Sequence, residues 1–528
     1  MAKPDRLRDY VDAAQVTVAI VAGVLAVSGS YLVAGPSTSF VAVPINRLVV
    51  RFMPGAVVTF SILVLGKLGE LVGFALAIGL TGSLFALGSL AVVLWTEDVP
   101  RRLVGTGIVS WVIATVLTRD PVLALGAAIP PTAAVALEGW VGDRGVHEGA
   151  AVARSRRRVL ALAAGSIGFA GLSSVLGGGS APAGPGEPLG DTAGGGDHTT
   201  TGARTGDSGG MGAGSAMTTT ESVQSAIADR LAEARARSLD VDGLHGLNSD
   251  VESFYTVDID SVDPSVDRSA WTLTVEGAVE EPMTLDFEAL RRYDGEHRFV
   301  TLRCVGDDLN GRLMDNALWT GIPVEAIFEA VKPTGSFVTL RAVDDYYESF
   351  PIEALRPGLL AYGMNGKYLP RAHGHPVRAL VPGHWGEVNV KWLSAIEVTE
   401  AEQPSYWERR GWHGTGPVHT VAKLWTVNHR SGGDVQVGGY AYAGTRGIRT
   451  VEVSTDGGET WNAARLSEPL ADADVWRQWA YTWTPTAGSQ EVVVRAVDGT
   501  GTVQPREHRD PFPSGATGWV SRTVDTDG

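Results

Sequence analysis

The stretch FVTLRCVGDDLNGR, residues 299–312, contains Cys304, which is the only cysteine among 528 residues. Its first seven residues have the β-branched and apolar character of a strand, and a loop that begins Gly-Asp-Asp follows. One cysteine excludes a disulfide within the chain. The stretch alone leaves two roles open for Cys304. It is either a small buried apolar side chain or a thiolate that acts as a nucleophile or metal ligand.

The polar part of the chain around this stretch shows two patterns. Within residues 241–402, short strand-like runs such as FVTLRAV at 337 alternate with short helical runs such as IPVEAIFEAV at 322. This alternation predicts an α+β domain. Within residues 417–528, strand-like runs are separated by Gly/Asp turns every eight to twelve residues, which predicts an all-β, immunoglobulin-like sandwich.

The N-terminal part is apolar instead. A bilayer-spanning helix needs about 20 apolar residues, and several runs approach this length. Residues 1–153 are therefore predicted to form a membrane region of about five helices, and residues 154–178 to contain a sixth. The apolar runs lie at about 13–34, 48–66, 71–94, 103–118, 122–140 and 159–176.

The sixth run follows SRRRVLALAAG at 155–165. Paired arginines before an Ala/Gly-rich apolar stretch are typical of a twin-arginine export signal, but they are equally typical of the positive flank of a membrane helix. Residues 179–240, rich in Gly, Ser, Thr and Pro, are predicted to be a flexible linker with a possible helix at 221–239.

Six crossings with the polar part outside would place the N-terminus outside as well. The loops that carry Arg47 and Arg51, Arg101 and Arg102, and the arginines from Arg144 to Arg158 would then be cytoplasmic, in agreement with the positive-inside rule. We therefore expect a multi-pass protein of the cell membrane with extracytoplasmic catalytic domains. Because no histidine precedes His147, no haem is expected in the spans, and the electron-transfer partner should be a separate protein.

Composition narrows the choice of partners. The formal net charge is −16, whereas nucleic-acid binding needs clustered Lys and Arg, so nucleic acid is not an expected partner. Only six of the 43 basic residues are lysines. This acidic, lysine-poor bias is typical of a halophile-like protein, although a GC-rich genome would give a similar excess of arginine.

The segment HGHPVRALVPGHWGEVNVKW, residues 373–392, places His373, Arg378 and Lys391 among glycines and prolines. Cationic side chains on loops that allow close backbone approach are suited to an anionic, phosphate-bearing ligand.

From about residue 250 to 525 the chain resembles the sulfite oxidase family of molybdopterin enzymes, including their C-terminal dimerisation domain. The resemblance rests on VTLRCVG at 300, on the run from 359 to 393, on GGYAYAGTRGIRTVEVSTDGGETW at 438–461 and on TVQP at 502. It implies a molybdenum-molybdopterin cofactor, oxygen-atom transfer to or from a small sulfur-containing or oxide substrate, and a homodimer.

The resemblance also implies roles for individual residues. Cys304 matches the family's molybdenum ligand, Tyr346 an active-site tyrosine, and Arg446 an arginine that helps to hold the substrate oxyanion. The pterin contacts of the family match Phe254, Tyr255, Cys304, Asp344, His373, Arg378, Asn389, Val390 and Lys391.

The departures from the family pattern bear on the substrate. Sulfite oxidases follow their cysteine with Gly, Asn and two arginines, where this chain has Asp307, Asp308 and Leu309, and they have a further arginine where it has Phe254. Two carboxylates near a dianion should repel it, unless Arg312, His384 or Arg446 compensates.

Three functions therefore remain open. The first is oxygen-atom transfer, with sulfite oxidation as its leading form. The second is reduction of S- or N-oxides, because NSDVESFYTVD at 248–258 resembles the methionine-sulfoxide reductase branch of the superfamily. The third is a non-catalytic surface protein that binds a partner.

Overall fold

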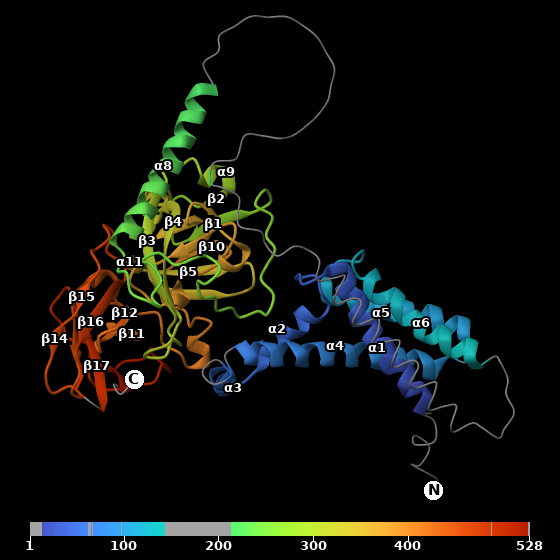
Figure 1. Ribbon diagram of the computed structural model, residues 1–528. Coiled ribbons are helices and arrows are strands. Elements are labelled where there is room, and N and C mark those ends of the chain that lie inside the picture. Colours follow the sequence, from blue (N-terminus) through green and yellow to red (C-terminus); the bar gives the residue numbers. More distant parts are fainter. Residues whose placement is uncertain are drawn as a thin grey trace, which may run out of the picture. The chain divides into compact units, whose positions relative to one another are not determined.

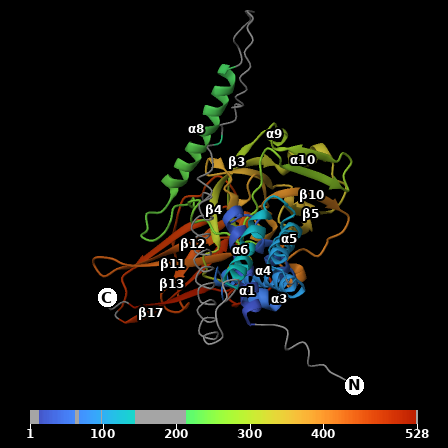
Figure 2. The same ribbon diagram turned by 90° about the vertical axis from the view of Figure 1, so that its right-hand side faces the viewer.

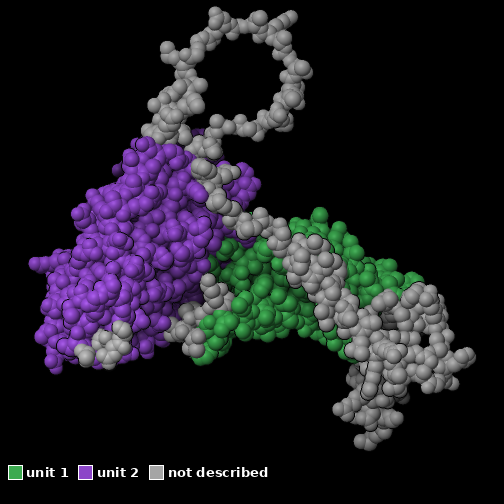
Figure 3. All heavy atoms as spheres, viewed as in Figure 1, with its two compact units in different colours: residues 1–182, 258–265 green, residues 183–257, 266–528 purple. Residues whose placement is uncertain are grey.

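A computed structural model describes residues 13–61, 65, 67–96, 98–142, 189, 213–486 and 488–525. The chain divides into two compact units (Figure 3). Unit 1 comprises residues 1–182 and 258–265, and unit 2 comprises residues 183–257 and 266–528. The predicted sixth helix and the paired arginines at 156–158 lie outside the described residues.

Unit 1 is helical (Figure 1). Among the described residues, three segments are long and apolar enough to cross a membrane, namely 15–34, 71–95 and 99–118, and a shorter apolar helix covers 125–136. Small residues let the helices approach closely: a Cβ on Gly29 would lie 2.2 Å from the carbonyl oxygen of Gly126. The helices are α1 (Ala13–Ala34), α2 (Ala42–Phe52), α3 (Gly55–Phe60), α4 (Lys67–Trp95), α5 (Val99–Thr118) and α6 (Leu125–Gly142).

The second predicted span, 48–66, is not one helix. Helix α2 ends at Phe52, Met53 is extended (φ −69°, ψ 131°), and α3 begins only after Pro54. Proline removes a backbone donor and disfavours helical geometry in the residue before it, which explains the break.

Segment 258–265 of unit 1 contacts α2. Arg47 forms an ion pair with Asp260 (2.7 Å), and the amide of Asn46 donates to the hydroxyl of Ser261 (3.3 Å). Residues 47 and 260 therefore lie side by side within unit 1. The expected cytoplasmic position of Arg47 stays a prediction.

Unit 2 begins with α8 (Ala213–Arg237), which starts earlier than the helix predicted at 221–239. Two sheets follow, one mixed and one antiparallel, with short helices between their strands, in agreement with the predicted α+β pattern. One sheet has the order β2 (Met283–Asp286), β1 (Thr272–Gly277), β10 (Leu393–Thr399), β5 (Phe337–Ala342) and β6 (Tyr347–Pro351), with β1 and β10 parallel. Three short helices accompany the strands: α9 (Phe287–Leu290), α10 (Val324–Val331) and α11 (Ile352–Leu355).

The second sheet of this domain carries the cysteine strand. Antiparallel pairing joins β3 to β4, β4 to β7, and β7 to both β8 and β9. Trp319 of β4 and Val300 of β3 are fully buried in its core. The strands are β3 (Glu296–Arg303), β4 (Met314–Pro323), β7 (Leu359–Met364), β8 (Lys367–Tyr368) and β9 (Arg378–Leu380).

The C-terminal part is the predicted all-β domain, with two four-stranded sheets that share one core; β11, β12, β13 and β17 are labelled in Figure 2. Val437, Val451, Trp479 and Val494 are fully buried between the sheets. The immunoglobulin-like character of the domain stays a prediction. The first sheet has the order β11 (Val421–His429), β12 (Val435–Tyr442), β16 (Arg477–Trp483), β15 (Arg465–Leu466), and the second β14 (Asn462–Ala463), β13 (Ile448–Ser454), β17 (Ser489–Asp498), β18 (Val520–Asp525).

Candidate functional site

Cys304 directly follows β3, where the strand turns into the Gly-Asp-Asp loop. Its N–H donates to the carbonyl oxygen of Leu313 (3.0 Å), and the N–H of Asp307 donates to the carbonyl oxygen of Cys304 (3.1 Å). Burial, reinforced by the charges of Asp307 and Glu387, raises the pKa of the Cys304 thiol to about 12. These surroundings do not activate a free thiolate nucleophile. They suit a thiol that loses its proton only when it binds a metal.

The cationic segment forms a compact cradle from the 3₁₀ turn η3 (Arg371–His373) and strand β9. The buried guanidinium of Arg378 donates to the carbonyl oxygens of His373 (3.3 Å) and Asn389 (2.8 Å), and the Lys391 ammonium donates to that of Ala372 (3.1 Å). Burial, followed by the charges of Arg378 and Lys391, lowers the pKa of His373 to about 4. His373 is therefore neutral near pH 7.

Three hydrogen bonds tie the cradle to the next turn, η4 (Gly386–Val388). The side chain of Asn389 accepts from the N–H of Val381 (2.7 Å) and donates to the carbonyl oxygen of Trp385 (3.0 Å). The carbonyl oxygen of Val390 accepts from the N–H of Ala379 (2.9 Å). Asn389 and Val390 thus hold the loop after η4 against β9.

Phe254 and Tyr255 join the cradle to the cysteine. The ring of Phe254 stacks on Tyr255 (5.6 Å between centroids) and meets the ring of His373 edge-on (5.4 Å). Burial raises the pKa of Tyr255, the charge of Cys304 raises it further, and Arg378 lowers it. Tyr255 therefore lies within electrostatic reach of both the cysteine and the cationic cradle.

Two glycines make room at this site. A Cβ on Gly374, whose φ is +102°, would lie 3.0 Å from the Cα of Lys391, and one on Gly386 would lie 2.8 Å from the hydroxyl of Tyr255. One Arg303 nitrogen, Nη2, is buried without a hydrogen-bond partner among the described residues. The soft thiol of Cys304 and the nearby cationic side chains fit a molybdenum cofactor that carries phosphate.

Tyr346 lies in the turn between β5 and β6. Its hydroxyl is 2.6 Å from Oε1 of Glu348 and 3.0 Å from the carbonyl oxygen of Glu387, and its N–H donates to the carboxylate of Asp344 (3.1 Å). Burial, followed by the charges of Glu348 and Glu387, raises the pKa of Tyr346, so its hydroxyl remains a donor at neutral pH. Glu387 influences both Tyr346 and Cys304.

Arg446 belongs to the C-terminal domain, in the turn η6 (Gly444–Arg446). It forms an ion pair with Asp498 (3.1 Å) and donates to the carbonyl oxygen of Val418 (2.8 Å). Both Arg446 and Arg303 lower the pKa of His419, after the larger effect of burial. Arg446 therefore lies near the cysteine strand, but its guanidinium is engaged within its own domain.

The structure corrects the expectation for Asp307. Its side chain is fully buried, forms ion pairs with Arg303 (3.1 Å) and Lys423, and accepts from the N–H of Leu313 (3.0 Å). Two cations thus surround one carboxylate, so Asp307 is not an uncompensated charge that repels a dianion. Asp308 is exposed to solvent.

Sequence reasoning missed Lys423, although a signal existed. It is one of only six lysines, and it occupies the middle of the apolar strand sequence VAKLW. Burial, with the charge of Arg303, lowers its pKa to about 8, against the opposing effect of Asp307.

Asp474 was missed as well. Its backbone carbonyl accepts from the N–H of Thr301 (2.9 Å), and its carboxylate accepts from the hydroxyl of Tyr442 (2.6 Å) and the N–H of Gly383 (2.9 Å). Through these bonds the C-terminal domain fixes strand β3, which positions Cys304.

Comparisons with known proteins agree with this arrangement. Residues 260–407 match the family described as the oxidoreductase molybdopterin binding domain, and residues 418–511 match the Mo-co oxidoreductase dimerisation domain. Both domains predicted from the resemblance are thereby confirmed.

Individual relatives point the same way. Sulfite oxidase of Gallus gallus is 32% identical over 301 residues, which are 46% of this chain and 65% of the relative. Mitochondrial sulfite oxidase of Homo sapiens is 31% identical over 297 residues, which are 46% of this chain and 54% of the relative. NADPH nitrate reductase of Aspergillus niger is 26% identical over 316 residues, which are 45% of this chain and 36% of the relative. The chain thus spans less than two thirds of the length of these curated relatives.

A solved structure, that of the sulfane dehydrogenase SoxCD from Paracoccus pantotrophus, aligns with a TM-score of 0.49 and 23% identity. The alignment covers 54% of this chain and 83% of that one.

Proposed function

We propose that this chain, which carries the molybdopterin-binding and dimerisation domains of the oxidoreductase family that includes sulfite oxidase, transfers oxygen to a small sulfur oxyanion, with sulfite as the first candidate. The observation that carries this proposal is the cluster of Arg303, Asp307 and Lys423 directly beside Cys304, in which two cations face one carboxylate.

Each residue of the site has a separate proposed role. Cys304 would bind molybdenum as a thiolate, and His373, Arg378 and Lys391 would hold the pterin and its phosphate. Bound there, molybdenum-molybdopterin would supply the two-electron chemistry of oxygen-atom transfer. Tyr346, which keeps its proton at neutral pH, would line the substrate side.

Charge favours an anionic substrate over a neutral S-oxide. A buried N–H without an acceptor costs roughly 1–3 kcal/mol, and Nη2 of Arg303 is such a donor among the described residues. A substrate oxyanion would satisfy it. A neutral S-oxide would leave more of the cluster's positive charge unbalanced.

The test compares two reactions of the purified protein. Sulfite is supplied with ferricyanide as electron acceptor, and in parallel methionine sulfoxide is supplied with a reduced viologen dye. Sulfite oxidation by protein that contains molybdenum and pterin supports the proposal. Reduction of the sulfoxide alone would support the reductase alternative, and protein without molybdenum that catalyses neither reaction would support the non-catalytic binding protein.

Cys304→Ser tests the ligand assignment. We expect the variant to retain its fold and most of its pterin, because the cradle holds the cofactor through other residues, but to lose turnover, because a hydroxyl is a poor soft ligand. Circular dichroism and pterin fluorescence are measured beside activity. Wild-type turnover by the variant would contradict the assignment.

We also propose a membrane topology. With α1, α4, α5, α6 and the apolar run 159–176 as five crossings, the N-terminus is cytoplasmic, and the loop with Arg47 lies outside together with the catalytic domain. This topology places ten basic residues of the membrane region inside and four outside, in accordance with the positive-inside rule. It also allows the ion pair of Arg47 with Asp260.

Single cysteines introduced into a Cys304→Ser background test this topology in intact cells. A membrane-impermeant maleimide should label Ser37→Cys, in the loop before α2, but not Lys3→Cys. The reverse pattern would contradict it. We further propose that segment 155–165 acts as a twin-arginine signal and that the protein forms a homodimer through residues 418–511. A separate protein would transfer the electrons, and the chain would bind no haem.

A further inference from the structure

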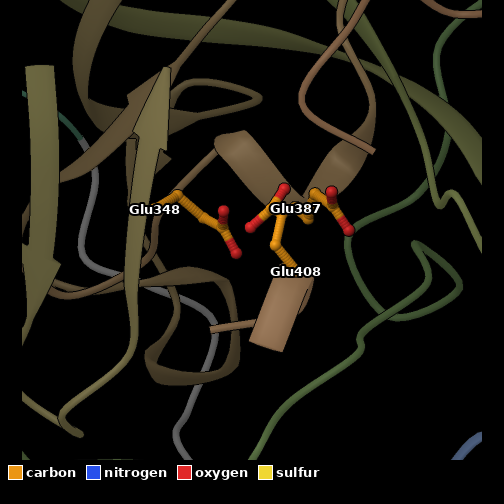
Figure 4. A group of neighbouring side chains, drawn as sticks. All are labelled: Glu348, Glu387 and Glu408. Atoms are coloured by element: carbon orange, nitrogen blue, oxygen red, sulfur yellow. The ribbon is translucent and has the colours of Figure 1, made fainter. Parts of the chain in front are cut away.

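Three glutamates from separate elements converge beside Tyr346. Glu348 lies in β6, Glu387 in η4, and Glu408 in the 3₁₀ turn η5 (Glu408–Arg410). One carboxylate oxygen of each lies within 4.8 Å of the other two, and Figure 4 shows the three side chains turned toward one another. Nothing in the family resemblance or in the proposed reaction accounts for this cluster.

Apart from Oε1 of Glu348, which accepts from the hydroxyl of Tyr346, the carboxylate oxygens have few partners. Glu348 is fully buried, yet its Oε2 has no hydrogen-bond partner, and the same is true of both buried oxygens of Glu387 and of Glu408 among the residues described. Within the same part of the chain, no arginine or lysine forms an ion pair with any of the three. The hydroxyl of Ser405, which is near Glu348 and Glu408, donates to the carbonyl oxygen of Ser349 instead (3.2 Å).

Three buried carboxylates cannot all stay ionised without a compensating charge. The compensation is either shared protons or a bound cation. Shared protons would need oxygen pairs about 2.5–3.0 Å apart. A calcium ion holds its oxygen ligands at about 2.3–2.6 Å, so ligands on opposite sides of it lie at most about 5 Å apart. One oxygen of each glutamate lies within 4.8 Å of the other two, which is close enough for all three to bind one such ion.

We propose that Glu348, Glu387 and Glu408 bind one hard divalent cation of the size of calcium, and that this ion fixes the position of Tyr346. The hydroxyl of Tyr346 contacts Oε1 of Glu348 and the carbonyl oxygen of Glu387, so the ion would order both acceptors of the tyrosine. The site is independent of the proposed reaction, and its test does not require activity.

The Glu387 carboxylate packs against Gly414. A Cβ on Gly414 would lie 2.3 Å from Oε1 of Glu387, so an alanine there would displace the carboxylate. Gly416, two residues further along the same loop, has nothing within 4 Å of such a Cβ. The two glycines offer a matched pair of alanine substitutions.

The experiment uses the full-length protein in detergent, treated with a chelator and then dialysed. Equilibrium dialysis with ⁴⁵Ca²⁺, and Mn²⁺ electron paramagnetic resonance as a second probe, should detect one tight site per chain. Glu408→Gln should weaken binding at least tenfold, whereas Glu288→Gln, at an exposed position in α9, should leave it unchanged. Ca²⁺ should raise the Tm of the wild type but not that of Glu408→Gln.

Binding of neither ion by the wild type, or equal binding by Glu408→Gln, would overturn the proposal. If Glu408→Gln does not fold, as judged by circular dichroism, Gly414→Ala is compared with Gly416→Ala. We expect a loss of affinity for Gly414→Ala only. Equal affinity in these two variants would count against the site.

Discussion

Lys423 shows how one side chain can stabilise the site without touching the substrate. It is fully buried, and Lys423→Met would leave Asp307 with Arg303 as its one ion-pair partner among the described residues. Removing one partner of a buried ion pair typically costs about 3–5 kcal/mol, so we expect a clearly lower Tm and faster loss of pterin. Lys367→Met, which removes an exposed lysine in β8, should change neither. A Lys423→Met protein as stable as the wild type would show that the ion pair of Lys423 with Asp307 contributes little to stability.

The turn between η3 and β9 illustrates what an element contributes. Gly374 has φ +102°, which strains any other residue, and an added Cβ would lie 3.0 Å from the Cα of Lys391. Gly374→Ala should therefore displace His373 and Arg378 relative to each other and lower the pterin content of the purified protein. Gly416→Ala, where φ is not positive and space is free, serves as the control. Full pterin content in Gly374→Ala would contradict this account of the cradle.

The meeting of β6, η4 and η5 predicts a pH dependence. Burial and the neighbouring Glu408 raise the pKa of Glu387 to about 8 from its ordinary 4.5, while Tyr346, Glu348 and His413 also face the cluster. Glu387 thus binds more protons in the folded protein than in the unfolded chain between these values, so its contribution to stability should fall as pH rises from about 4.5 to 8. Thermal melts in chelator should show this fall, Glu387→Gln should reduce it, and Ca²⁺ should flatten the wild-type curve.

The whole molecule should be a dimer. Residues 418–511 match a dimerisation domain, and that domain also holds strand β3 through Asp474 and Tyr442. Multi-angle light scattering of the detergent-solubilised protein, corrected for bound detergent, should give the protein mass of two chains. The mass of a single chain at micromolar concentration would contradict a stable dimer.

Much of this protein could be predicted from sequence because the signals are local. The length of the apolar runs predicted α1, α4 and α5, and the run of β-branched and apolar residues before Cys304 predicted β3. The spacing of His373, Arg378 and Lys391 on glycine-rich turns indicated the cradle. Pro54 was a local signal for the break between α2 and α3, but the apolar residues on both sides of it favoured the prediction of one continuous span.

Only the tertiary structure decided how the charges are balanced. Asp307 looked like a repulsive charge until Lys423, more than a hundred residues away, proved to be its partner, and Glu348, Glu387 and Glu408 became a cluster only when three separate elements met. The pair of Arg47 with Asp260 likewise joins residues that lie more than two hundred positions apart in the sequence. Periodicity depends on neighbours along the chain, whereas the energy of a buried charge depends on groups brought near it by folding, and sequence spacing does not encode that distance.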